Sequence, residues 1–138
     1  MLNQQATILL YDAMLNELNN QMTDNSMDVR LLQKYSSDEV SKINHKYALE
    51  EEMVRNEINQ LDEKSGSEYN DLMAELKDLK DAQDKELERV EEKNEDAESA
   101  KTLENDNLEV RAEAIRADKE ALEEAMQKEI EDEFGYFQ

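Results

Sequence analysis

The sequence predicts an all-α protein built on a long coiled-coil helix, with a short apolar helix at its N-terminal end. Three observations predict this class. Apolar residues recur every eighteen positions, the chain holds two glycines and no proline, and charged residues reach 38% while aromatic residues reach only 5%. Compact domains need turns that normally use Gly and Pro. The composition is instead typical of coiled coils and long helices.

The eighteen-residue period gives the helix one apolar stripe. Eighteen residues make five helical turns, so positions eighteen apart lie nearly in line along the axis. Three such lines, offset by zero, four and seven residues, form the stripe. The first line is Leu18, Ser36, Val54, Leu72, Val90, Leu108 and Met126, and the second is Met22, Val40, Ile58, Leu76, Asn94, Ala112 and Ile130. The third line is Ile43, Leu61, Leu79, Ala97 and Ile115. Each repeat counts as seven plus eleven residues, which predicts little supercoiling. A disordered chain would not hold this register.

Residues 1–35 are predicted to be an apolar helical association segment. A helix that is apolar on most sides is buried on several sides, either in a local bundle or in an oligomer. Its most regular face holds Ile8, Tyr11, Leu15, Leu18 and Met22. The polar residues 23–26 are the expected break, since Asp24, Asn25 or Ser26 could cap a following helix.

Residues 36–138 are predicted to form the acidic long coiled-coil helix. Ser36 and Glu39 have the spacing of a capping box, which marks a helix start. Two places weaken the helix, residues 64–67 around Gly66 and the polar stretch 94–107. The register passes through both without a phase shift, which favours one continuous helix. A hinge or the corner of a helical hairpin at either place stays open.

The C-terminal end is predicted to form an aromatic tip. Phe134 would be the last helical side chain, and Gly135 would take the left-handed conformation that ends many helices. Tyr136 and Phe137 could then fold back on the last turn. The tip could serve as a docking point or only as a hydrophobic cap.

The predicted association surface combines the N-terminal face with the later stripe. Its residues are Ile8, Tyr11, Leu15, Leu18, Met22, Leu72, Leu76, Leu79, Val90, Leu108, Ile115, Met126 and Ile130. Gln83 and Asn94 interrupt the apolar pattern. A buried amide fixes register by requiring a partner amide, whereas both residues could equally face solvent.

The charge excludes several classes of partner. The net charge is −21, of which residues 1–35 carry −2 and the rest −19. Such a chain does not bind nucleic acid or anionic membranes by charge, but it attracts cationic partners. The absence of cysteine excludes disulfides, and no apolar run is long enough to span a membrane. Without a basic signal-peptide region, the expected location is the cytoplasm or a particle or filament reached by another route.

No residue pattern supports catalysis, a cofactor or a metal site, so an enzyme is not expected. His45 lies off the stripe, and no phosphate-binding loop, zinc-binding helix or calcium loop is present. The consecutive acidic residues at 50–52, 91–92 and 131–133 point about 100° apart on a helix and do not converge on one ion.

The organisation of Ile8 to Met22, the stripe over 72–130 and the C-terminal Phe134-Gly135-Tyr136-Phe137 resembles the small helical filament and needle subunits of type III-like secretion systems. That resemblance implies a self-assembling subunit of a filament, needle or virion. The acidity favours another class, a chaperone, scaffold or adaptor that holds a basic or aggregation-prone protein. Enzymatic activity ranks third.

Overall fold

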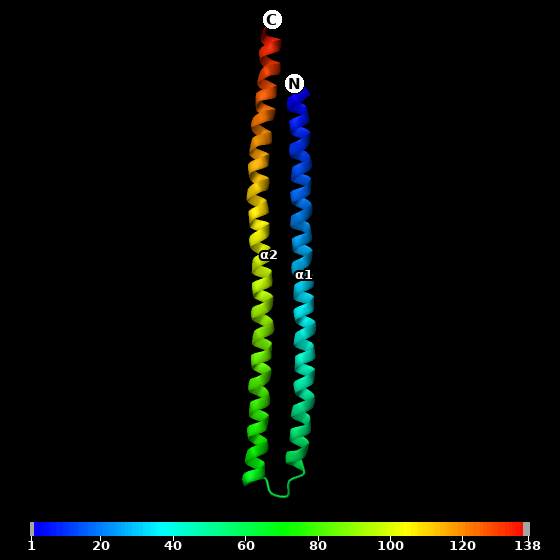
Figure 1. Ribbon diagram of the computed structural model, residues 1–138, viewed down its shortest axis with the longest axis vertical. Helices are drawn as coiled ribbons and strands as arrows, with labels where there is room; N and C mark the ends of the chain where they lie inside the picture. The colour runs from blue at the N-terminus through cyan, green and yellow to red at the C-terminus, as the bar shows by residue number, and fades with distance from the viewer. Residues whose placement is uncertain (1, 137–138) are drawn as a thin grey trace. The chain divides into compact units, whose positions relative to one another are not determined.

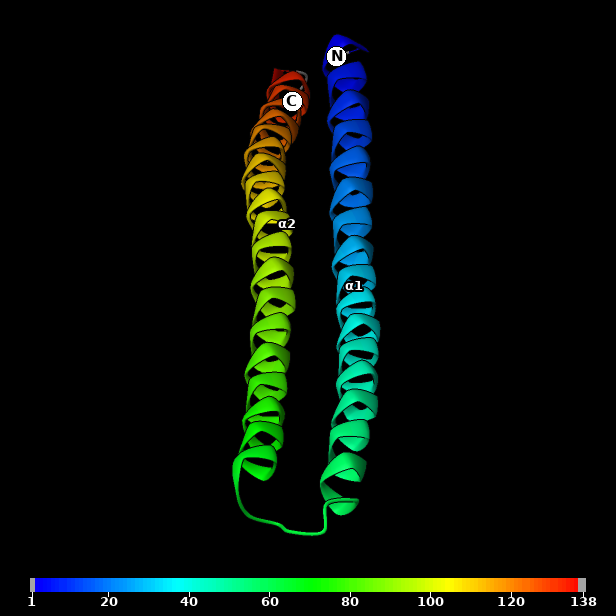
Figure 2. The same ribbon diagram turned by 60° about the horizontal axis from the view of Figure 1, so that its bottom comes forward.

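The chain folds into two long helices, confirming the all-helical prediction. The computed structural model describes residues 2–136, in which α1 spans Leu2–Asn59 and α2 spans Ser67–Tyr136. No strand occurs in this described part. The two helices lie side by side in both ribbon views (Figures 1 and 2).

The residues divide into two compact units, each containing a part of both helices. We call residues 2–29 and 99–136 the terminal unit, and residues 30–98 the turn unit. Within the turn unit, the chain reverses direction at residues 60–66, so the two helical parts are antiparallel. Within the terminal unit, contacts join Asp12 to Lys119 and Asp28 to Lys101, which also requires antiparallel helices.

The stretch between the helices marks the break that the sequence left open. Gln60 and Leu61 still donate backbone hydrogen bonds to the last turn of α1, at 3.1 to 3.2 Å. Gly66 then adopts a φ of 100°, and its carbonyl accepts the Asn70 N–H at 3.0 Å to start α2. A positive φ is costly for residues with a Cβ. The favoured continuity through Gly66 is therefore wrong, and the corner covers 60–66.

Two expected helix ends are absent, and the favoured continuity through residues 94–107 is confirmed. Residues 23–26 and the capping-box residue Ser36 lie inside α1, and residues 94–107 lie inside α2. A continuing helix satisfies each N–H through the carbonyl four residues earlier, so no cap is needed. Ser26 instead donates its hydroxyl to the Met22 carbonyl at 3.0 Å. The short separate N-terminal helix is thus part of α1.

The C-terminal end also differs from the prediction. Helix α2 continues through Gly135 to Tyr136, and among the described glycines only Gly66 has a positive φ. Gly135 therefore does not take the left-handed conformation that was expected. Phe134 is 69% exposed. The predicted role of Phe137 falls outside the described residues.

Candidate association surfaces

The apolar stripe lies between α1 and α2 within each unit. Residues of the three lines are buried or half-buried, with the exception of Ile130, which is 37% exposed. The eighteen-residue period therefore describes packing of one helix on the other inside this chain. Association of the same residues with a second chain stays a prediction.

The terminal unit has the better-packed core. Leu18, Leu108 and Ala112 are buried together, and Ala112 is fully inaccessible. Leu15, Met22 and Ile115 pack against this cluster, while Ile8, Tyr11 and Met126 are half-buried. A small residue at position 112 lets the two helices approach closely, because a longer side chain would need space that is already filled.

A buried amide pair lies beside this core. The Asn25 side chain is 6% exposed and donates to the Asn105 Oδ1 at 2.9 Å. The Asn105 amide in turn donates to the Met22 carbonyl at 3.4 Å. Sequence reasoning interpreted Asn25 as a helix cap and gave Asn105 no role. The spacing could have identified Asn25 as a core position. It follows Leu18 by seven residues, which is the offset of the third line of the apolar stripe.

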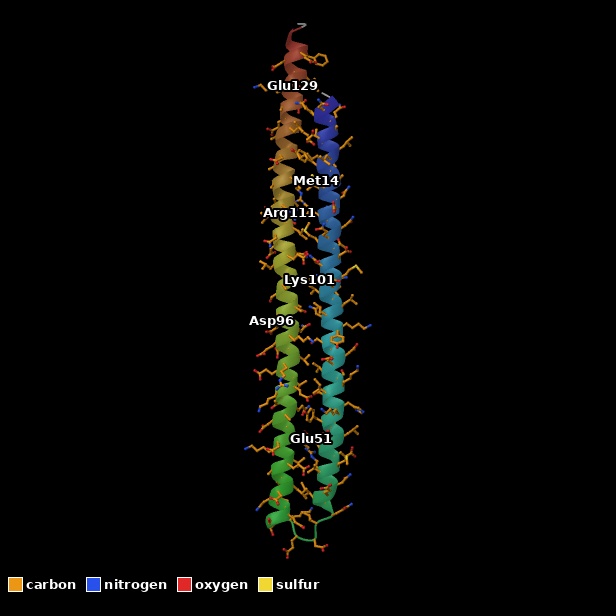
Figure 3. All side chains as sticks on the ribbon, viewed as in Figure 1. Met14, Glu51, Asp96, Lys101, Arg111 and Glu129 are labelled. Carbon is orange, nitrogen blue, oxygen red and sulfur yellow. The ribbon has the colours of Figure 1, made fainter. Side chains whose placement is uncertain are left out.

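Ion pairs flank the core of the terminal unit. The α1 part of this unit contains acidic residues but no lysine or arginine, so its cationic partners come from α2. The Lys101 Nζ lies 3.4 Å from the Asp28 carboxylate, and Lys119 pairs with Asp12. Figure 3 shows Lys101 on the side of α2 that faces α1. The hydrogen bond from Lys119 to Asp12 raises the pKa of that lysine.

The turn unit buries residues from α1 more completely than residues from α2. Tyr47, Val54 and Ile58 are 5–9% exposed, all from α1. The facing predicted residues of α2 are only half-buried, namely Leu72, Leu76, Leu79 and Val90. The Lys46 Nζ lies over the Tyr47 ring, 5.0 Å from its centroid, and pairs with Glu86 at 3.5 Å. Burial, and then a hydrogen bond with Glu86, raise the pKa of Tyr47.

The two predicted register residues behave differently. Gln83 donates its side-chain amide to the Asn44 Oδ1 on the other helix at 2.9 Å, in an exposed position. Asn94 is half-buried and lines a groove of about 340 Å³ together with Leu32, Tyr35 and Val90. An amide pair at the surface competes with water and specifies register less strongly than a buried one.

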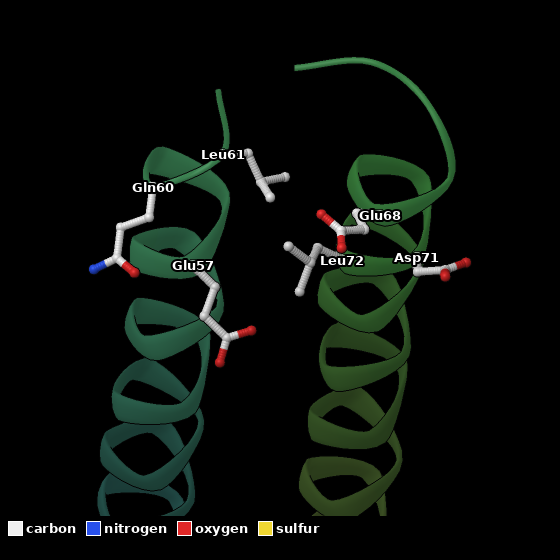
Figure 4. A pocket seen from close by; sticks show the side chains of 6 residues that line it. All are labelled: Glu57, Gln60, Leu61, Glu68, Asp71 and Leu72. Carbon is white, nitrogen blue, oxygen red and sulfur yellow. The ribbon is translucent and has the colours of Figure 1, made fainter. Parts of the chain in front are cut away.

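A further groove lies at the turn. It has a volume of about 510 Å³ and is lined by Glu57, Gln60, Leu61, Glu68, Asp71 and Leu72. Figure 4 shows Leu61 and Leu72 pointing toward one another between the helix ends, whereas Gln60 and Asp71 point away. Three of the six lining side chains are carboxylates, those of Glu57, Glu68 and Asp71, and the other three are Gln60, Leu61 and Leu72.

Metal-binding clusters and membrane-spanning helices were both sought among the described residues. Residues 2–136 contain no cluster of three or more His, Cys, Asp or Glu side chains that could hold a metal ion. No helix in this part is long and apolar enough to cross a bilayer. Comparison with known proteins found no matching family model, no matching curated protein and no matching solved structure.

Proposed function

We propose that this chain is a non-enzymatic structural subunit, an antiparallel coiled-coil pair that self-assembles into a larger helical structure such as a filament, needle or virion component. The proposal rests on which apolar side chains are buried within the chain and which stay exposed. The predicted stripe is taken up between α1 and α2, yet large apolar side chains remain exposed on both helices. Apolar surface that stays exposed after the two helices have paired is available for contacts with further subunits.

Residues 1–35 support the same proposal. Leu9 and Leu10 are 69% and 59% exposed, and Met14 is 40% exposed. These side chains lie outside the core formed by Leu18 with Leu108. The segment thus keeps apolar surface for contacts with another helix after it has paired with α2.

Sedimentation equilibrium of the purified chain across concentration and salt tests the proposal. Like charges on −21 subunits oppose assembly, and salt screens them over roughly 8 Å at physiological ionic strength. We expect mass to rise with concentration, and assembly to strengthen between roughly 0.05 and 0.5 M salt. A monomer at every concentration and salt would contradict the proposal.

One observation favours a second candidate, an acidic chaperone, scaffold or adaptor for a basic protein. Helix α2 carries 25 acidic and 10 basic residues, a net charge of −15, whereas α1 carries 10 and 5, a net of −5. In this case salt would weaken the complex, because the attraction itself is screened. The direction of the salt effect therefore separates the two candidates.

A further inference from the structure

We propose that the outer face of α1 in the turn unit is a docking surface for a second copy of this chain, which binds antiparallel about a two-fold axis at Lys42. This inference rests on the proposed self-assembly and names the surface that carries it. The face consists of Leu31, Tyr35, Leu49 and Met53, with Lys42 at its centre.

Leu31, Leu49 and Met53 lie on the exposed side of α1, and Tyr35 lies at its edge, where it also lines the groove beside Val90 and Asn94 of α2. Leu31 and Leu49 are eighteen residues apart, as are Tyr35 and Met53, so each pair is aligned along the axis. Their exposed fractions are 62%, 50%, 60% and 66%. The buried Tyr47 and Val54 lie on the opposite side of the same helix. This part of α1 is therefore apolar on two faces, of which one is unpartnered.

The spacing makes the face complementary to itself. Tyr35 and Leu49 lie seven residues before and after Lys42, and Leu31 and Met53 lie eleven residues before and after it. A two-fold axis at Lys42 brings Leu31 of each copy opposite Met53 of the other, and Tyr35 opposite Leu49. Such an isologous contact buries every apolar residue of the face at once.

The charges select the antiparallel orientation. Asp38 and Lys46 lie four residues before and after Lys42, so the two-fold arrangement sets Asp38 of each copy level with Lys46 of the other along the helix axis, and the same Lys46 ammonium also pairs with Glu86 of α2 at 3.5 Å. A parallel arrangement would set Asp38 against Asp38. The two Lys42 side chains meet at the axis, where their length allows the ammonium groups to reach water.

The charges also select a second copy rather than a basic protein as the occupant. The α1 part of the turn unit holds six acidic and five basic residues, a net charge of −1, whereas the α2 part holds thirteen and five, a net of −8. A cationic partner is attracted to α2. The outer face of α1 is where another strongly acidic chain can approach with little repulsion.

Cysteine cross-linking tests the axis directly, because the chain has no cysteine of its own. We expect Lys42→Cys to form a disulfide-linked dimer under mild oxidation, since the two residues 42 face each other. Asn56→Cys should not cross-link, because antiparallel copies separate the two residues by ~42 Å along the axis. Ser37→Cys, on another side of the helix, is the control for random collision. Dimers through Asn56→Cys, or equal yields at all three positions, would overturn the proposal.

Matched substitutions test the energetics in the full chain. Leu31→Glu with Leu49→Glu should weaken self-association at least ~100-fold in sedimentation, because each substitution acts twice in a two-fold interface. Leu103→Glu, at a residue 63% exposed on α2, should leave the affinity unchanged. Circular dichroism should show equal helix content in all variants. If the wild type assembles and the double substitution has no effect, this surface is wrong but self-assembly stands; if the wild type stays monomeric, both proposals fail.

Discussion

The terminal unit and the turn unit follow the same eighteen-residue rule and pack to different degrees. The terminal unit buries Leu18 against Leu108 and Ala112 from the opposite helix. The turn unit buries Tyr47, Val54 and Ile58, all from α1, while α2 presents half-buried side chains to them. The period thus fixes which side of a helix faces its partner. The residue types at those positions decide how completely the contact excludes water.

The largest expected difference between the units concerns their buried aliphatic residues. Leu18→Ala should cost about 2–5 kcal/mol, since Leu18 lies in a core closed by both helices. Val54→Ala should cost about 1.5 kcal/mol, because two fewer carbons are buried. Hydrogen exchange measured separately in residues 2–29 and 30–59 checks this. If both variants lost the same amount of protection in both stretches, the two units would not differ in stability, and this prediction would be wrong.

The two cross-helix amide pairs provide a sharper comparison. Asn25→Ala should cost ~1–2 kcal/mol, because the half-buried Asn105 then loses its amide partner. The exposed pair of Gln83 and Asn44 should contribute less than ~0.5 kcal/mol, since water replaces either amide. Double-mutant cycles by urea denaturation measure both coupling energies. Equal couplings would mean that burial does not distinguish the pairs.

The two glycines should respond to alanine in opposite directions. Gly66→Ala should destabilise the turn unit by ~1–2 kcal/mol, because a residue with a Cβ is strained at a φ of 100° even where space is open. Gly135→Ala lies in a helix with nothing near the added carbon, so it should stabilise α2 by up to ~1 kcal/mol. Thermal denaturation should shift down for the first variant and up for the second.

The smallest expected effect appears at high pH. The pKa of Tyr47 is raised above 10.0 and that of Lys119 above 10.5, so the folded chain holds both protons more tightly than the unfolded chain does. Their contribution to stability is present below these values and is lost as pH rises through the folded pKa. The urea midpoint should stay level from about pH 7 to 9 and fall above about 10. In Tyr47→Phe the fall should be smaller, and an unchanged profile would contradict the role of Tyr47.

The sequence predicted the helical class and the buried line, and it left residues 64–67 open as a corner while favouring a continuous helix there. Val54, Ile58 and Leu61 before the turn are in phase with Leu72, Leu76 and Leu79 after it. Periodicity alone therefore cannot distinguish a straight helix from a hairpin. The distinction depends on Gly66, whose positive φ is visible only in three dimensions.

The polar positions show a second limit of sequence reasoning. Asn25 has the residue type of a helix cap and the spacing of a core position, and its partner Asn105 lies eighty residues further on. A sequence does not state which distant amide completes such a pair. Gln83 pairs with the amide of Asn44 on the other helix in an exposed position, and its role in setting the register stays a prediction. The association surface itself stays a prediction, since its residues face the other helix of the same chain.

Each stripe residue of α1 lies beside a particular part of α2, and this antiparallel pairing limits which changes of length the chain can tolerate. Deleting one residue from α1 would turn the side chains on one side of the deletion by about 100° relative to the other, which removes them from the stripe. Deleting eighteen residues from one helix would keep the stripe straight. Each stripe residue beyond the deletion would then lie opposite a different residue of the other helix. Length variants should therefore differ within residues 60–66, or by matched losses of seven, eleven or eighteen residues in both helices at equal distances from the turn.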